Sequence, residues 1–357
     1  MKIGIIGLPQ TGKKTFFEVL TKYVISEKDL ASTKALKSLA EIRDTRFDTL
    51  LGIYNPKKQV RARIEIELLP KIEKDVIAKG EIFKNIAELD AICHVARSFT
   101  DEAVYHISGS VDAKRDIDLV NAELVLSDLL FIEKRLERID AELKKSKNEV
   151  AAKERVVLAK FKEQLDKELP LRLLTLDKDE KKYISSYPFV TLKKMVVVLN
   201  CSENSLRDTA LLEKLRASYA PLGIEVMQAC AKAEAEIARL ETEEERKEFL
   251  GALGIAEPAI NALTRSCIKA LNLISFFTVG EDEVRQWPIP AGSSAPEAAG
   301  AIHSDLQKGF IRAEVMKYDD LVALGSEEKV KQAGKFGVKG KEYIVQDGDI
   351  LSIRFNV

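Results

Sequence analysis

Hydrophobic residues follow several distinct patterns along this chain, and each pattern predicts a different kind of structure. Residues 91–95 and 195–199 are almost continuously apolar, which is typical of strands buried on both faces of a parallel sheet. Residues 3–6 form a shorter apolar run, and a glycine-rich turn and a helical pattern over residues 13–22 follow it. Together these runs predict an α/β domain.

Between residues 117 and 182, charged residues alternate with leucine, isoleucine and valine at helical spacing. The apolar positions of this pattern are Val125, Leu129, Ile132, Leu136, Ile139 and Leu143. Such spacing predicts long amphipathic helices, and two antiparallel helices inserted into the α/β domain would account for it. The charged positions are most simply interpreted as the solvated face of these helices.

The pattern changes again after Cys267. Residues 274–279 predict a strand, and several prolines and a glycine interrupt the sequence that follows. Residues 343–345 and 350–355 predict two strands joined by an Asp-Gly turn. We therefore expect a small β-rich domain with little helix from residue 274 to the end.

Length and composition limit the possible classes of protein. A chain of 357 residues exceeds the size of one hydrophobic core, so two or three domains are expected. The 56 basic and 57 acidic residues exclude a globally basic nucleic-acid binder but leave room for local basic patches. Four widely separated cysteines favour reduced thiols over a zinc site or disulfides. No stretch approaches the roughly 18 apolar residues of a membrane span, so we expect a cytoplasmic protein without membrane or DNA partners.

Residues 7–15 match the phosphate-binding pattern GxxxxGK between the first predicted strand and helix. In such a loop, backbone N–H groups and the helix N-terminus surround phosphates, and the lysine neutralises their charge. The candidate phosphate-binding residues are Gln10, Thr11, Gly12, Lys13, Lys14 and Thr15. A glycine-rich turn without a ligand is the alternative interpretation.

Lys14 occupies the position where this motif normally has a serine or threonine hydroxyl that binds Mg²⁺. An ammonium group cannot ligate a cation. Thr15 follows directly, but one residue along a helix is a rotation of about 100°, so its hydroxyl points elsewhere. The sequence therefore assigns no metal ligand in this loop.

Several stretches of the chain resemble YchF-type members of the Obg-like ATPase family. Residues 7–15 resemble the family's GLPNxGKST loop and residues 90–97 its DAICHVVR strand. Residues 106–112 and 116–118 resemble the HVSGKVDP and DIE segments that follow this strand. The resemblance covers nearly the whole chain and implies a P-loop ATPase.

The densest resemblance is to the family's C-terminal TGS domain. It lies in residues 276–278, 283–285, 295–296, 298–300, 302–303, 308–315 and 354–357. The resemblance implies an α/β P-loop NTPase (Obg-type G) domain at residues 1–116 and 184–273. It also implies an inserted α-helical coiled-coil hairpin at residues 117–183 and a β-grasp, ubiquitin-like TGS domain at residues 274–357.

A base-recognition motif of the form NxxE is also implied by the resemblance. Asn200, Cys201 and Glu203 carry it, directly after an apolar run, and residues 229–232 align with a loop whose backbone contacts the base. A glutamate replaces the aspartate with which GTPases bind guanine, which implies a preference for ATP. From the residues alone, a strand-ending turn with Asn200 as a helix cap stays open.

Departures from the family pattern concentrate in the segments that contact Mg²⁺ and the γ-phosphate. Residues 65–68 replace the family's Asp-Ile-Ala-Gly, so we interpret Glu65 as standing in place of the metal-linked aspartate and Leu68 in place of the glycine. Residues 70–80 replace a glycine-rich stretch, and residues 26–38, with Thr33 as one candidate ligand, do not resemble the first switch. We therefore expect weak ATP binding that is nearly indifferent to Mg²⁺, and slow or absent hydrolysis.

The histidines identify no catalytic residue. His94 lies in an apolar run and is interpreted as a satisfied core histidine, while His106 and His303 belong to no catalytic motif.

Two classes of function follow. The first is an ATP-binding protein that acts with the ribosome, a partner implied by the family. The alternative is a non-catalytic ribosome or RNA-interaction protein that no longer uses nucleotide. Several residues of the last domain, with the aromatic residues Phe310, Phe336 and Tyr343 nearby, are candidate RNA contacts, and a solvated surface is the alternative. The candidates are Trp287, Lys308, Arg312, Lys331, Lys335, Lys339 and Lys341.

Overall fold

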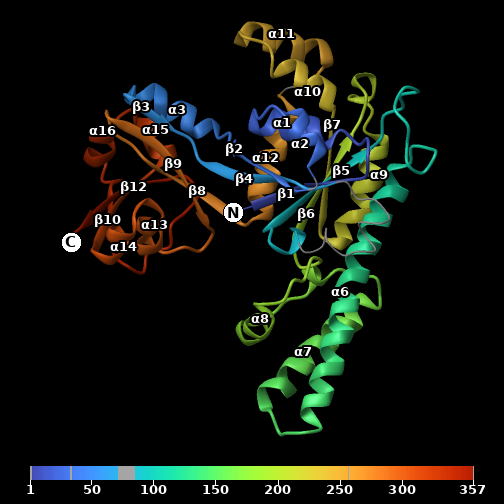
Figure 1. Cartoon of the computed structure of the whole chain (residues 1–357). Coiled ribbons are helices and arrows are strands. Elements are labelled where there is room, and N and C mark those ends of the chain that lie inside the picture. Colours follow the sequence, from blue (N-terminus) through green and yellow to red (C-terminus); the bar gives the residue numbers. More distant parts are fainter. Residues whose placement is uncertain (1, 33, 71–84, 256, 357) are drawn as a thin grey trace. The chain divides into compact units, whose positions relative to one another are not determined.

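The computed structural model describes residues 2–32, 34–70, 85–255 and 257–356. It divides into two compact units, which we describe separately (Figure 1). The first unit comprises Met1–Ala40 and Glu65–Leu263, and the second comprises Glu41–Ile64 and Thr264–Val357. None of the described helices combines the length and apolar character needed to cross a lipid bilayer. Thr33 and residues 71–80, considered in the sequence analysis, lie outside the described residues.

The described residues of the first unit form a sheet in the order β2-β4-β1-β5-β6-β7. Its strands are β1 (Lys2–Ile6), β2 (Leu36–Glu41), β4 (Arg63–Leu68), β5 (Ala91–Arg97), β6 (Lys194–Asn200) and β7 (Ile224–Ala229). From β4 to β7, neighbouring strands of this order are parallel. All of β5, and all of β6 except Lys194, is buried. The predicted α/β class and its two fully buried strands are confirmed.

Helices pack on this sheet and extend beyond it. They are α1 (Lys13–Thr21), α2 (Glu27–Ala31), α6 (Ala113–Leu143), α7 (Glu149–Leu165), α8 (Lys178–Ile184), α9 (Ala210–Tyr219), α10 (Ala231–Ile237), α11 (Glu243–Leu253) and α12 (Ala259–Ala270), with 3₁₀ turns at Leu171–Leu173, Glu203–Ser205 and Ala220–Leu222. Ile117 of α6 and Leu212 of α9 share a buried cluster with Ile92 and Val197 of the sheet. Burial of this apolar surface is the main driving force for the packing.

The long helix α6 leaves the sheet and its distant half lies beside α7 (Figure 1). Ile132 and Ile139 of α6 are buried in one core with Leu158 and Phe161 of α7. Asn148 caps the start of α7, because its side chain accepts hydrogen bonds from the N–H groups of Val150 and Ala151. The prediction of long amphipathic helices is confirmed, and the coiled-coil geometry stays a prediction.

The described residues of the second unit form a mixed sheet in the order β11-β10-β12-β8-β9-β3. Its strands are β3 (Lys58–Val60), β8 (Leu273–Thr278), β9 (Glu283–Pro290), β10 (Phe310–Lys317), β11 (Gly337–Lys339) and β12 (Asp349–Phe355). Its helices are α3 (Thr45–Tyr54), α13 (Ala295–Ile302), α14 (Ser304–Lys308), α15 (Tyr318–Leu324) and α16 (Glu327–Gln332). The strand predicted at residues 274–279 is confirmed as β8. The expectation of little helix was wrong, because four short helices lie between β9 and β11.

The hairpin predicted at the end of the chain was also wrong. Residues 343–345 form no strand, and β12 pairs instead with β10 and β8. The Asp-Gly turn packs against β8, because the Asp347 carboxylate accepts a hydrogen bond from Ser275 N–H at 2.9 Å and Gly348 N–H donates to Ser275 O at 2.8 Å. Gly348 has φ 86, a left-handed conformation that favours glycine.

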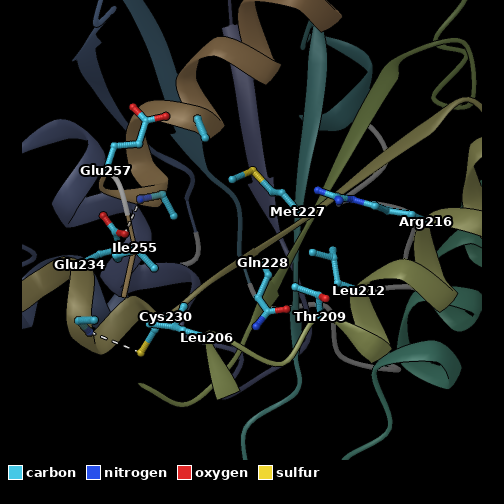
Figure 2. Close-up of a pocket in the computed structure, with 13 residues that line it drawn as sticks. Leu206, Thr209, Leu212, Arg216, Met227, Gln228, Cys230, Glu234, Ile255 and Glu257 are labelled. Atoms are coloured by element: carbon cyan, nitrogen blue, oxygen red, sulfur yellow. Dashed lines mark hydrogen bonds between the residues drawn. The ribbon is translucent and has the colours of Figure 1, made fainter. Parts of the chain in front are cut away.

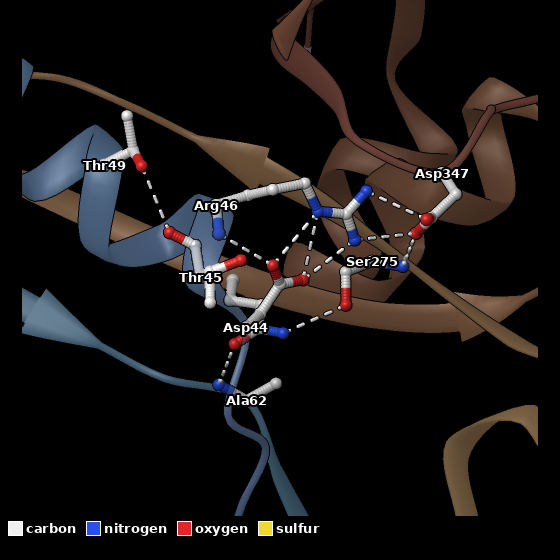
Figure 3. Close-up of polar contacts among 8 residues, drawn as sticks. Asp44, Thr45, Arg46, Thr49, Ala62, Ser275 and Asp347 are labelled. Atoms are coloured by element: carbon white, nitrogen blue, oxygen red, sulfur yellow. Dashed lines mark hydrogen bonds and ion pairs between the residues drawn. The ribbon is translucent and has the colours of Figure 1, made fainter. Parts of the chain in front are cut away.

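Residues 41–64 belong to the second unit, although the domain ranges drawn from the sequence did not include them there. Strand β3 pairs with β9, and Phe47 of α3 is buried in a core with Phe277. Figure 3 shows Arg46 between two carboxylates, at 2.8 Å from both Asp44 Oδ2 and Asp347 Oδ2. The N-terminal segment is therefore an integral part of this core.

Candidate nucleotide site

The glycine-rich turn lies between the end of β1 and the start of α1. Gly12 precedes α1 with φ 88, a left-handed conformation. A Cβ atom at this position would lie 2.2 Å from the Asn200 Nδ2 atom. Glycine is therefore required both for the backbone conformation and for the close approach of Asn200.

Lys13 is almost completely buried within this turn. Its Nζ atom donates hydrogen bonds to Gly7 O at 3.0 Å and to Pro70 O at 3.1 Å. The ammonium group thus lies between the turn and the residue that follows β4. Lys14 is half-exposed, and no ion pair or hydrogen bond of its side chain occurs within the described part of the chain.

Asn200 joins the turn to the loop after β7. Its Nδ2 atom donates to Thr11 O at 2.9 Å, and its Oδ1 atom accepts from Ala231 N–H at 2.9 Å. Ala231 is the first residue of α10, so Asn200 also caps this helix in part. Because the side chain is buried, removal of either bond would leave a polar group without a partner.

A cavity of about 690 Å³ lies beside Asn200 at the carboxyl ends of the parallel strands. Its walls are the start of α1, residues 99–104 after β5, residues 200–204 after β6, and the start of α10. Open α/β sheets bind ligands at this edge. Of the residues selected from the sequence, Gly12, Thr15, Asn200, Cys201 and Glu203 line the cavity, whereas Gln10, Thr11, Lys13 and Lys14 do not.

Glu203 and Lys232 form an ion pair at the wall of this cavity, with Nζ and Oε1 3.0 Å apart. The hydrogen bond to Glu203 raises the pKa of Lys232 above its ordinary value.

Cys201 is buried beside Cys230, and burial raises the pKa of Cys201 to about 11. The Cys201 thiol therefore stays protonated near neutral pH, which does not suit a nucleophile or a metal ligand.

The interpretation of Glu65 as the metal-linked acid was wrong. Glu65 pairs with Lys2 at the amino end of β1, whereas the glycine-rich turn follows the carboxyl end. The strand position next to the turn is taken by Leu68, which pairs with Ile5. Residues 7–15 and 68–70 contain no carboxylate. These two described segments therefore do not fit a magnesium site of the usual kind.

Glu67, the neighbour of Leu68 in β4, forms ion pairs within the first unit. It is buried and lies 2.9 Å from Lys37 Nζ and 3.6 Å from Lys2 Nζ. The hydrogen bond to Glu67 raises the pKa of Lys37. Glu67 thus balances two lysines within the sheet.

Two histidines lie near the site. His94 is buried in β5, and burial and the Lys13 charge lower its pKa to about 3. Neither ring nitrogen has a hydrogen-bond partner among the described residues, so the expectation of a satisfied core histidine is wrong on that point.

His106 Nδ1 accepts from Ser108 N–H at 3.1 Å, and its Nε2 lies 2.9 Å from Asp116 Oδ2. Sequence reasoning missed this buried pair.

A second cavity, of about 270 Å³, lies behind β7 (Figure 2). Glu234 of α10 lines it, and its carboxylate accepts a hydrogen bond from Ala259 N–H at 2.6 Å, at the start of α12. Gln228 donates to Ser205 O and Arg216 donates to Val226 O. These polar groups already have protein partners, which makes this cavity the weaker candidate for a ligand.

Known proteins resemble the chain over its whole length. A family described as "YchF-GTPase_C: Protein of unknown function (DUF933)" matches residues 273–356. "Ribosome-binding ATPase YchF" of Bacillus subtilis is 39% identical over 364 residues, covering 99% of both chains. The protein of the same name from Escherichia coli O157:H7 is 38% identical, covering 100% of this chain and 99% of its own.

The solved structures agree with this assignment. The YchF GTPase of Schizosaccharomyces pombe superposes with a TM-score of 0.84 at 31% identity, covering 99% of this chain and 97% of that one. Identity of this level over nearly complete chains, together with the shared fold, shows that the chain belongs to the YchF family.

Proposed function

We propose that this chain binds ATP in the 690 Å³ cavity, acts together with the ribosome, and hydrolyses ATP slowly or not at all. The observation that carries the proposal is the buried Asn200 side chain, which joins the glycine-rich turn to the loop after β7. The names of the relatives, ribosome-binding ATPases, support the nucleotide and the partner.

The proposal includes the finer division of the fold. The first unit is a P-loop NTPase domain, α6 and α7 are its inserted helical hairpin, and the C-terminal sheet is a TGS domain of the β-grasp type. The family match at residues 273–356 supports a separate C-terminal module. The predicted limits of 1–116, 117–183, 184–273 and 274–357 belong to this proposal, with the correction that residues 41–64 join the second unit.

In this arrangement the backbone of residues 10–15 would hold the phosphates. Lys13 would exchange its carbonyl partners for phosphate oxygens and neutralise their charge. Gly12 carries no side chain, which allows the Asn200 amide to lie against this turn. Asn200, Cys201 and Glu203 would border the adenine base.

Slow hydrolysis is proposed because phosphoryl transfer depends on charge neutralisation around the γ-phosphate. Lys14 supplies no metal ligand, and residues 68–70 supply no carboxylate. Magnesium chemistry is therefore not assigned to the described residues, and no catalytic base is proposed.

The central experiment is calorimetric titration with ATP, with and without Mg²⁺. We expect weak binding that Mg²⁺ changes little and that Lys13→Ala abolishes. Lys247→Ala, at an exposed position on α11, is the control and should bind as the unchanged protein does. ATP turnover that Lys13→Ala removes would contradict the slow-hydrolysis part of the proposal.

Lys14 also favours a second candidate function, a ribosome-interaction protein without nucleotide. Cosedimentation with ribosomes distinguishes the two. In the first case Lys13→Ala changes the ATP dependence of ribosome binding, and in the second case ATP and Lys13→Ala have no effect.

A further inference from the structure

Arg97 is an unusual residue for the end of a central strand. It is the last residue of β5 and its side chain is only 1% exposed. No ion pair of Arg97 occurs among the residues that the structure describes. Burial lowers the pKa of Arg97, and the charge of Asp101 acts in the opposite direction. A buried cation without a bonded carboxylate is costly, so its other contacts must compensate for it.

Three backbone carbonyls of one loop provide these contacts. Arg97 Nε donates to Phe99 O at 3.1 Å, Nη2 to Asp101 O at 3.3 Å, and Nη1 to Tyr105 O at 3.4 Å. The guanidinium carbon also lies 4.4 Å from the centre of the Phe99 ring. A planar guanidinium can donate in several fixed directions at once, which an ammonium group cannot reproduce. One side chain therefore sets the course of residues 99–105.

This loop is a wall of the 690 Å³ cavity. Phe99, Thr100, Asp101 and Val104 line it opposite the start of α10. The loop is also tied to the base motif, because Ser98 N–H donates to Asn200 O at 2.9 Å. Its outer part is open to solvent, with Tyr105 74% exposed. Within the loop, Ala103 N–H donates to the Asp101 carboxylate and Val104 N–H to Asp101 O, and Arg97 ties these residues to the end of β5.

We infer that Arg97 is a positioning residue for the base side of the nucleotide site, acting through the backbone of residues 99–105. The inference rests on the proposed function. Phe99 and Asp101 line this cavity and Lys13 does not, so we assign Arg97 to recognition of the nucleoside and not of the phosphates.

The test compares ATP with inorganic triphosphate, which has no base. In calorimetry, Arg97→Ala should weaken ATP binding about tenfold or more and leave triphosphate binding unchanged. Arg97→Lys should recover part of the loss. Arg172→Ala is the matched control, because Arg172 also donates to backbone carbonyls, those of Lys193 and Leu222, before the amino ends of β6 and β7. It should change neither affinity.

Equal losses for both ligands in Arg97→Ala, or no loss for either, would overturn the inference. If Arg97→Ala does not fold, Arg97→Lys carries the same test with a smaller expected loss. If the unchanged protein binds neither ATP nor triphosphate, the proposed function and this inference are overturned together. If the unchanged protein binds ATP and triphosphate, and the ratio of the two affinities is the same in the Arg97 variants, only the inference about Arg97 is overturned.

Discussion

The base side and the phosphate side of the candidate site differ in how completely the described residues build them. On the base side, Asn200 has both of its amide partners, Glu203 has Lys232, and Arg97 holds the adjoining loop. On the phosphate side, residues 7–15 and 68–70 contain the lysines Lys13 and Lys14 and no acidic residue. These described segments thus provide bonded polar groups for a nucleoside but no acidic ligand for a metal ion.

The largest effect is expected from Asn200→Ala, which would break the link between the two sides. It leaves two buried backbone groups without partners, so the free energy of unfolding should fall by about 2–4 kcal/mol and ATP affinity by about 100-fold. Urea unfolding and calorimetry measure the two quantities. Asn121→Ala is the control, because the amide of Asn121 has no hydrogen-bond partner among the described residues. An Asn200 variant with ATP affinity intact would remove the main support for the site.

The stability of the fold should depend on pH through Glu234, which belongs to α10, the helix whose start borders the base side. Burial raises the pKa of this carboxyl to about 7, whereas an unfolded chain has a value of about 4.3. Between these values the folded state binds more protons, so stability falls as pH rises through this window, by about 1–3 kcal/mol. Urea unfolding at pH 5 and pH 8 measures the fall. Glu234→Gln keeps an oxygen that accepts from Ala259 N–H but does not titrate, so in this variant the fall in stability between pH 5 and pH 8 should vanish. The same fall in the variant would refute the assignment to Glu234.

A smaller effect is expected on the phosphate side from Lys14→Ser. A hydroxyl at this position restores one metal ligand, so Mg²⁺ should increase ATP affinity about tenfold in the variant and hardly at all in the unchanged protein. Calorimetry with Mg²⁺ or with a chelator gives the ratio, and Lys247→Ser is the matched control. A strong Mg²⁺ effect in the unchanged protein would show that the phosphate side is complete after all.

The smallest effect concerns base selectivity. Lys232→Met would release the Glu203 carboxylate, which could then accept hydrogen bonds from the N–H groups of guanine. We expect the ratio of ATP to GTP affinity to fall about threefold. Competition between the two nucleotides measures the ratio, with Lys247→Met as control. Glu203→Asp should shift it in the same direction, and a rise in either variant would count against the base-site assignment.

The sequence predicted the elements better than their pairing. Strands β5 and β6 were predictable because buried apolar runs have few other structural solutions, and the loop of residues 7–15 because its spacing is specific. Glu65 was misassigned because a local pattern does not specify the register between strands, which depends on contacts with β1. The predicted C-terminal hairpin failed because Asp347 bonds to Ser275, a residue far away in the chain. Arg97 and the His106–Asp116 pair were missed for a different reason. Their partners lie only 2 to 10 residues away in the chain, but the sequence pattern does not show that these side chains are buried and bonded to them.

The participation of residues 41–64 in the second unit affects how the chain is made. Lys57 and Asp282, which flank the pairing of β3 with β9, bond to each other although they are 225 residues apart. A ribosome that adds about 5–20 residues per second would deliver the second partner roughly 10–45 s after the first. During this interval Phe47 and Leu50 lack the core that buries them in the finished protein. The second unit can therefore close only after β12 has been synthesised.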